Sequence, residues 1–500
     1  MSSLNTVDEL AKLAAKNKLV PFLGAGSSYG HLQLNWDEIS NDMKNELAIK
    51  EGSNLEIAEK YVQEFGIDGL CRFLKDKLIV SEYNESLDIV PLIVLSLGVG
   101  LIYTTNQDNV FEKCIESYGR RFRSVTTLEN LASYLPGENL LFKYHGAIHE
   151  PKTIIFTESS YRDRIKDTNH FLNIRMRSDL LTKSFLFVGY SFRDPNIILI
   201  FEELYKVFSE KLPKSYLIAF DYTPELEILN EKYGVQVINP IDEVSEANNN
   251  VEAFEKYMIS LCEETYKNKT TAEIDSLFKS DIPHATRVVS KYEIQSLKAS
   301  FENHSLEERI KFFRAIFDES LIPEIYHENV TELYLKLCKS CTSRKQSDSL
   351  SAAVFNLHVN FESSLEILAS VLATSIHRGH DEGLDLFRPH IKSSNSSIYP
   401  VAAARAVELI VSWGQTINDA FRRQVTNWIE GYNKLPSNIQ SYIRSQMNEA
   451  WRVHSTYENP ISYWERLGHK RFFSNEKSFE SIRDNLIDRL PKKFNKSYEE

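Results

Sequence analysis

Short apolar segments alternate with helical segments through residues 19–240, and this alternation constrains the fold more than any other feature of the chain. The apolar segments have the composition of buried strands, and the helical segments between them can serve as the crossovers that parallel strands require. The alternation predicts an α/β domain with a largely parallel, doubly wound sheet. The predicted strands lie within residues 19–28, 101–105, 122–125, 140–144, 182–188, 216–220 and 235–238.

Polar residues or glycines follow four of these strands directly. Gly24 follows the first strand, Asn106 belongs to a Thr-Thr-Asn run after the second, His145 follows the fourth, and Gly189 and Ser191 follow the fifth. A neutral imidazole at such a position can accept a proton near pH 7. The carboxyl ends of parallel strands meet at one rim, where open α/β sheets bind their ligands. These residues together therefore predict a nucleotide site.

Each of these stretches also has a purely structural interpretation. Asn106 or Asp108 can cap the helix that is predicted to start near residue 109. The Gly-Ala-Gly turn at 24–26 can be a tight strand-to-helix turn as readily as a phosphate cradle, because Tyr29 replaces the third glycine of the dinucleotide fingerprint. The Asp-Pro pair at 194–195 suits the start of a helix. Only the four stretches taken together favour a ligand site.

The sequence pattern changes after residue 270. Most of the 18 glycines precede this point, and clear strand patterns stop there. Pro283 lies in a polar segment, 271–285, which we predict to be a linker. It joins an α/β domain, residues 1–270, to an all-helical domain, residues 286–500. In the latter, apolar residues recur at the spacing of helical packing faces. These stripes lie at 306–317, 330–341, 365–376, 407–414 and 439–451.

The composition is that of an ordinary globular chain, with 42% hydrophobic and 26% charged residues. A net charge of −12 disfavours non-specific nucleic-acid binding, which needs a basic face. The most apolar run, 89–103, contains proline and glycine and is too short to span a membrane, and the N-terminus lacks the apolar core of a signal peptide. Five cysteines provide no disulfide framework, so we expect a cytoplasmic location.

Four stretches, in their order and spacing, resemble the sirtuin-like domains of bacterial anti-phage defence proteins. They are Gly24-Ala-Gly-Ser-Ser28, Thr104-Thr-Asn-Gln-Asp108, Lys143-Tyr-His-Gly146 and Gly189-Tyr-Ser-Phe-Arg-Asp-Pro195. The resemblance covers residues 10–240 and implies a Rossmann-like domain that binds NAD. The fold class expected for the whole chain is thus an α/β, Rossmann-like, largely parallel sheet followed by an all-α C-terminal domain.

The resemblance also implies roles for the residues at matching positions. Asn106, His145 and Asp108 are the implied catalytic residues, with Asn106 and Asp108 near the nicotinamide ribose and carboxamide. The residues implied to bind the dinucleotide are Gly24, Ala25, Gly26 and Ser28 around the phosphates and the adjoining ribose, Gly189 and Ser191 on the adenosine side, Asp221 at the adenine ribose, and Thr105, to which no particular part of the dinucleotide is assigned.

The chain departs from the protein-deacylating sirtuins, which carry a small zinc module with two Cys-x-x-Cys pairs after the catalytic histidine. No cysteine lies between His145 and Cys262, and the Pro-Asp-Phe-Arg loop of the deacylases is missing. The single Cys-x-x-Cys, Cys338 to Cys341, falls on a helical stripe and is better explained by core packing than by a metal site. We therefore expect no metal, and a cleft that does not grip an acyl-lysine peptide.

The remaining chemistry is cleavage of NAD+ at its N-glycosidic bond, which gives nicotinamide and ADP-ribose. The expected mechanism has Asn106 orienting the ribose and the attacking water, His145 accepting a proton from the water directly or through a ribose hydroxyl, and Asp108 holding the carboxamide or steadying the charge. The alternatives are a zinc-free protein deacylase or ADP-ribosyltransferase, and a non-catalytic NAD-binding regulatory protein.

An enzyme of this kind depletes the NAD+ of its own cell, as in abortive infection, so its activity needs control. The helical C-terminal domain is the predicted place for oligomerisation, for sensing a phage protein, or for docking a partner defence ATPase. The expected partners are NAD+ and further copies of the chain, with no membrane and no nucleic acid.

Overall fold

The computed structural model describes residues 6–135, 138–278 and 287–321, together with residues 329, 333, 337 and 340. They divide into two compact units. The first unit extends to Glu273 and also takes in Ser290–Asn303, and the second comprises Ile274–Val289 and the chain from His304 onward. The predicted boundaries at 271–285 stay a prediction, but helix α15 (Lys291–Ser300) groups with the first unit.

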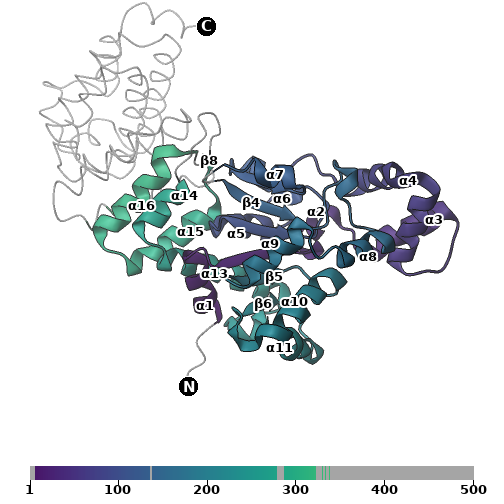
Figure 1. Cartoon of the computed structure of the whole chain (residues 1–500). Coiled ribbons are helices and arrows are strands. Elements are labelled where there is room, and N and C mark those ends of the chain that lie inside the picture. The colour runs from purple at the N-terminus through teal and green to yellow at the C-terminus, as the bar shows by residue number, and fades with distance from the viewer. Residues whose placement is uncertain are drawn as a thin grey trace, which may run out of the picture. The chain divides into compact units, whose positions relative to one another are not determined.

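The first unit is built on a seven-stranded sheet in which every pair of neighbours is parallel. The strand order is β3-β4-β2-β1-β5-β6-β7. All seven predicted strands are present, and the predicted α/β, Rossmann-like class is confirmed for this unit (Figure 1). The strands are β1 (Leu19–Leu23), β2 (Leu101–Thr104), β3 (Phe122–Val125), β4 (Asn139–Lys143), β5 (Ser184–Val188), β6 (Ser215–Ile218) and β7 (Val235–Ile238).

Helices cover both faces of this sheet, because alternate strand side chains enter two different packing layers. On one face, Phe22 and Phe187 pack with α9 (Phe171–Leu180), α10 (Pro195–Phe208) and α11 (Ile228–Tyr233). The other layer contains α1 (Thr6–Ala15), which packs on β1, and α13 (Asn250–Asn268), which packs on α1, α15 and α5 (Val90–Ser96). The strands at the centre are consequently buried along their whole length.

A helical module with its own small core adjoins the sheet (Figure 1). It is formed by α3 (Trp36–Leu47), α4 (Asn54–Leu78) and α8 (Glu158–Lys166). The helical prediction for residues 36–85 is correct for these two long helices, but their apolar stripe breaks at Phe65, which is 43% exposed. The break arises because Gly66, at φ +72°, kinks α4.

Shorter elements complete the described part of the first unit. They are α2 (Tyr29–Leu32), α6 (Val110–Ser117), α7 (Leu128–Ala132), α12 (Pro240–Glu243) and the single-turn 3-10 helices Ala25–Ser27, Pro151–Thr153, Ser209–Lys211, Pro224–Glu227 and Phe301–Asn303. The apolar run at 89–103 becomes α5, a turn and β2, as predicted. No helix within the described ranges is long and apolar enough to cross a membrane.

The described elements of the second unit are α14 (Thr271–Phe278), whose first turn still belongs to the first unit, α16 (Leu306–Glu319) and a short parallel pair, β8 (Arg287–Val288) with β9 (Ser320–Leu321). The first predicted stripe lies on α16, where Ile310 and Phe313 are buried. The strand pair is an addition to the all-helical prediction. The stripes from 365 onward and the Cys338–Cys341 pair lie outside the described residues.

Candidate active site

The four strands that carry the motifs end level with one another at one rim of the sheet. Leu23 pairs with both Thr104 and Val188, and Thr104 also pairs with Lys143. The motif residues therefore leave the sheet side by side, as predicted. The chain winds in opposite directions on either side of β1 and β5, so this rim is also the topological switch point of the sheet.

Close packing of two loops explains the glycines at this rim. Gly189 has φ +62°, and a Cβ atom there would lie 2.4 Å from the backbone nitrogen of Ser27. The amides of Gly24 and Gly26 donate to the carbonyls of Val188 and Gly189, at 3.0 and 2.9 Å, and the next two amides close the 3-10 turn. These amides are thus used within the chain, which favours the tight-turn interpretation over a cradle of successive free amides.

The side chain of Asn106 is fixed by a directional chain of hydrogen bonds. Its Nδ2 donates to the carbonyl of Gly24 at 3.0 Å and to Oγ of Ser28 at 3.1 Å, and Oγ of Ser28 donates to Oδ1 of Asp108 at 3.2 Å. A carbonyl only accepts, so Asn106 must turn its NH2 group toward this chain. No hydrogen bond found among the described residues uses Oδ1 of Asn106, which leaves this oxygen available as an acceptor.

Asp108 lies beneath this chain of bonds, with 6% of its surface exposed. Its Oδ1 also accepts from the amide of Val110, the first residue of α6, at 2.9 Å, so the helix-start interpretation holds for Asp108 in this bond, although the N-cap position itself is Asn109. It does not hold for Asn106, which bonds the glycine turn instead. Burial raises the pKa of Asp108 to about 6, although the nearby charge of Lys143 opposes the shift.

His145 is buried immediately beyond β4, with 3% of its surface exposed. The chain turns sharply after it, because Gly146 has φ +81° and a Cβ there would meet the carbonyl oxygen of Thr153 at 2.2 Å. Nδ1 of His145 lies 3.3 Å from the hydroxyl of Tyr161, and Nε2 lies 2.9 Å from Oδ2 of Asp194. The second contact is electrostatic rather than an aligned hydrogen bond, since the carboxylate lies off the N–H direction.

Asp194 and Tyr161 are the site residues that sequence reasoning missed. Asp194 starts α10 as predicted, because its Oδ1 accepts from the amide of Asn196 at 2.8 Å, and its other oxygen faces His145. Its position within the Gly189–Pro195 motif could have indicated that it belongs to the site. Tyr161 comes from α8, outside every motif, and nothing in its sequence neighbourhood indicates the contact with His145.

Two adjoining cavities occupy the rim. The first, of about 470 Å³, lies between the rim and the helical module, and the second, of about 830 Å³, extends along the end of β6. Both are lined by Gly26, Gly189, Tyr190, Ser191 and Arg193, so they form one two-part cleft across the switch point.

The cleft brings together most of the predicted site residues. Gly24 and Ser28 line neither cavity, but both bond the side chain of Asn106. The predicted residues that line the first cavity are Ala25, Gly26, Thr105, Asn106, Asp108, His145, Gly189 and Ser191, and those that line the second are Gly26, Gly189, Ser191 and Asp221.

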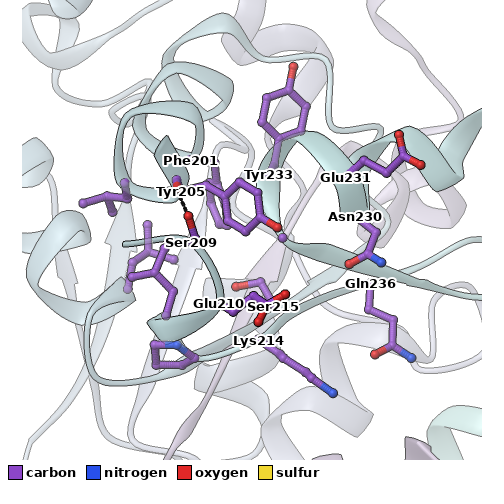
Figure 2. Close-up of a pocket in the computed structure, with 15 residues that line it drawn as sticks. Phe201, Tyr205, Ser209, Glu210, Lys214, Ser215, Asn230, Glu231, Tyr233 and Gln236 are labelled. Atoms are coloured by element: carbon purple, nitrogen blue, oxygen red, sulfur yellow. Dashed lines mark hydrogen bonds between the residues drawn. The ribbon is translucent and has the colours of Figure 1, made fainter. Parts of the chain in front are cut away.

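A third cavity, of about 530 Å³, lies at the opposite end of β6 and β7. Figure 2 shows Phe201 and Tyr205 of α10 on one side of it and Tyr233, Asn230 and Gln236 on another. It contains none of the motif residues, and we do not assign the active site to it. Within the described ranges, no cluster of three or more His, Cys, Asp or Glu side chains is arranged to hold a metal ion.

A parallel, doubly wound sheet with a two-part cleft across its switch point defines the class of dinucleotide-binding α/β domains. Comparison with known families is more specific. Residues 100–238 match the family described as the SIR2-like domain. This part of the α/β unit is therefore similar to SIR2-like domains, and the predicted resemblance to sirtuin-like defence domains is confirmed.

Curated relatives show the same likeness. NAD(+) hydrolase ThsA of Enterococcus faecium is 28% identical over 218 residues, 42% of this chain and 45% of that protein. NAD(+) hydrolase ThsA of Acinetobacter baumannii is 28% identical over 219 residues, 42% of this chain and 44% of that protein. Defense-associated sirtuin 2 of Bacillus subtilis is 21% identical over 536 aligned positions, 98% of this chain and 51% of that protein. The chain spans about half the length of these relatives.

Proposed function

We propose that this chain hydrolyses NAD+ to nicotinamide and ADP-ribose and acts in anti-phage defence by depleting NAD+. One observation carries the proposal: Asn106, whose amide oxygen is used by no hydrogen bond found among the described residues, and His145 line one cavity, which continues into a second cavity across the switch point. The names of the relatives, NAD(+) hydrolase and defence-associated sirtuin, support the same activity.

The two-part cleft suits the two halves of the dinucleotide. In the proposal, the adenosine half occupies the second cavity beside Asp221, and the nicotinamide ribose occupies the first cavity beside Asn106. The pyrophosphate lies at the junction, where Arg193 is exposed and lines both cavities. Among the described residues, no carboxylate lies within ion-pair distance of Arg193, so its guanidinium can bind a phosphate.

Cleavage of the bond between the ribose C1′ and the nicotinamide nitrogen sends the electron pair to nicotinamide and leaves an oxocarbenium ion. The amide oxygen of Asn106 carries partial negative charge and is placed to stabilise this cation and to hold the attacking water. Asp108 positions that oxygen through Ser28. His145 accepts the proton that a water or ribose hydroxyl releases.

The test is incubation of the full-length protein with NAD+ while nicotinamide release is followed. The parental protein should release nicotinamide, and Asn106→Ala and His145→Ala should each lower kcat by about 100-fold or more. His149→Ala is the matched control, since His149 lies four residues further on and is exposed. Parental rates in either of the first two variants would contradict the assignment of that residue.

Two outcomes would favour the alternative functions. Release that depends on an added acyl-peptide or protein acceptor would indicate a deacylase or an ADP-ribosyltransferase. Equilibrium binding of NAD+ without any release of nicotinamide would indicate a regulatory NAD-binding protein.

Control of the activity is assigned in this proposal to the C-terminal half. The alignment with Defense-associated sirtuin 2 supports this assignment, because it extends over 98% of the chain. The proposal includes a cytoplasmic location, homo-oligomers, and a phage protein or a partner ATPase as the trigger. Measuring the size of the protein and its NAD+ turnover together, with and without a phage lysate, tests this part.

A further inference from the structure

Both ring nitrogens of His145 are covered by other side chains of the protein. The imidazole is almost fully buried, with Tyr161 at Nδ1 and Asp194 at Nε2. His145 lines the first cavity, but a substrate there can exchange a proton with a ring nitrogen only through one of these two groups, or after one of them moves.

The position of the ring proton follows from the partners. An ionised carboxylate only accepts, so the lone pair of a bare Nε2 would repel Oδ2 of Asp194 at 2.9 Å. A proton on Nε2 removes this repulsion even without an aligned hydrogen bond, and Nδ1 is then the acceptor of the ring. The hydroxyl of Tyr161 must then donate its proton to Nδ1.

Tyr161 and His145 line the same cavity side by side, and the Tyr161 hydroxyl covers Nδ1 of the imidazole. Tyr161 lines the first cavity together with Asn106, and its ring meets His145 edge to face, with centroids 5.0 Å apart. Because its proton is given to Nδ1, the lone pairs of its oxygen remain free to accept from an O–H group in the cavity. Burial and the charge of Asp194 raise the pKa of Tyr161, so the hydroxyl keeps its proton until a transfer occurs.

We propose that Tyr161 is a further catalytic residue, which relays the proton of the attacking water or ribose hydroxyl to His145. This inference rests on the NAD+ hydrolysis proposed above. The reacting O–H bond breaks and its proton goes to the oxygen of Tyr161, while the proton of Tyr161 moves to Nδ1. His145 becomes an imidazolium, and the phenol hydroxyl is restored with the incoming proton. The imidazolium later releases its proton to solvent.

Asp194 is the positioning residue of this relay. Its Oδ1 accepts from the first turn of α10, which fixes the carboxylate, and its Oδ2 faces Nε2. It thereby selects the tautomer that leaves Nδ1 free to accept and stabilises the imidazolium as it forms.

The first experiment compares Tyr161→Phe with the parental protein in nicotinamide release. The variant keeps the ring and loses only the hydroxyl, so kcat should fall by about 100-fold while KM for NAD+ stays within about twofold. The double variant Tyr161→Phe/His145→Ala should have the same kcat as His145→Ala alone, because the two residues act in one relay. Tyr257→Phe, which removes a buried hydroxyl from α13, is the control and should keep parental kcat.

Parental kcat in Tyr161→Phe with a strong loss in His145→Ala would overturn the relay and leave NAD+ hydrolysis intact. Absence of turnover in the parental protein would instead contradict the proposed function. A second measurement, nitrogen NMR of the labelled histidine ring, decides the relay without turnover. It should show the proton of His145 on Nε2, and Asp194→Asn, which preserves the helix cap, should weaken that preference. A proton on Nδ1 would overturn the proposal.

Discussion

Asp108 carries a carboxyl group that is nearly removed from water and yet accepts hydrogen bonds from Ser28 and Val110. The two bonds hold the charged form, but burial outweighs them and raises the pKa to about 6. Between about pH 4 and pH 6, the folded state keeps a proton that the unfolded state has lost. The free energy of unfolding therefore falls as the pH rises through this window.

We expect Asp108→Asn to remove this pH dependence, because an amide oxygen can accept the same two bonds without a charge. The free energy of unfolding of the variant minus that of the parental protein should be larger at pH 7.5 than at pH 4, by about 2 kcal/mol. Urea unfolding at the two pH values measures the difference. An offset that is equal at both pH values would show that the carboxyl group titrates normally.

Arg193 tests how the dinucleotide lies in the cleft. Its exposed guanidinium lines both cavities, where the proposal places the pyrophosphate. Arg193→Gln should raise KM for NAD+ by about tenfold with little change in kcat, because the phosphates do not change during the reaction. Arg193→Lys keeps the charge and should recover part of the affinity. An unchanged KM in Arg193→Gln would place the phosphates elsewhere.

At the scale of elements, the sequence predicts the strands well because each is an apolar run bounded by polar or glycine residues. Parallel pairing then brings residues 106 and 145 to one rim, and both line one cavity. Helix α13 was not predicted, since the Asn248–Asn250 segment resembles a loop. In the structure, Asn249 caps that helix by accepting from the amide of Glu252.

The contacts of His145 were not predictable for a different reason. Strand order and register follow from short-range patterns, but Tyr161 reaches the imidazole from α8, whose position depends on packing in the helical module. Asp194 was visible in sequence as a helix start, and one cap oxygen leaves the other free to face a neighbour. The local sequence pattern indicates the helix cap, but it gives no information about the contact with His145.

The contact between the Gly24–Gly26 turn and Gly189 is a close approach of two loops, which a Cβ atom would disrupt. Gly189→Ala combines a positive φ with a Cβ that meets backbone atoms. Gly66 has a similar φ of +72° but no atom within 4 Å of the added Cβ. We expect Gly189→Ala to lower the free energy of unfolding by about 2 kcal/mol more than Gly66→Ala, as measured by urea unfolding. Equal losses would mean that the loops separate freely.

At the scale of the whole molecule, the first unit is not one continuous segment of chain. The chain leaves it after Glu273 and returns at Ser290 to form α15. The side chains of Tyr292, Ile294 and Leu297 are buried there, and Arg120 pairs with Glu293 at 2.7 Å. A helix that lies beyond the predicted linker thus completes the packing of α13 and α5.

This arrangement predicts how fragments behave. A fragment of residues 1–303 should unfold at a temperature at least about 5 °C higher than a fragment of residues 1–273, because the shorter one exposes the apolar surface that α15 covers. Thermal unfolding followed by circular dichroism measures both. Equal midpoints would show that α15 adds no stability.

The return of the chain has a mechanical consequence. Three covalent crossings, at 273–274, 289–290 and 303–304, join the two units, and two of them flank α15. A rearrangement of the C-terminal half would exert force on both ends of this helix. Its neighbour α5 is followed, after a four-residue turn, by the strand that delivers Asn106 to the cleft. The route from the crossings that flank α15 to Asn106 therefore passes through a single packing contact, the one between α15 and α5.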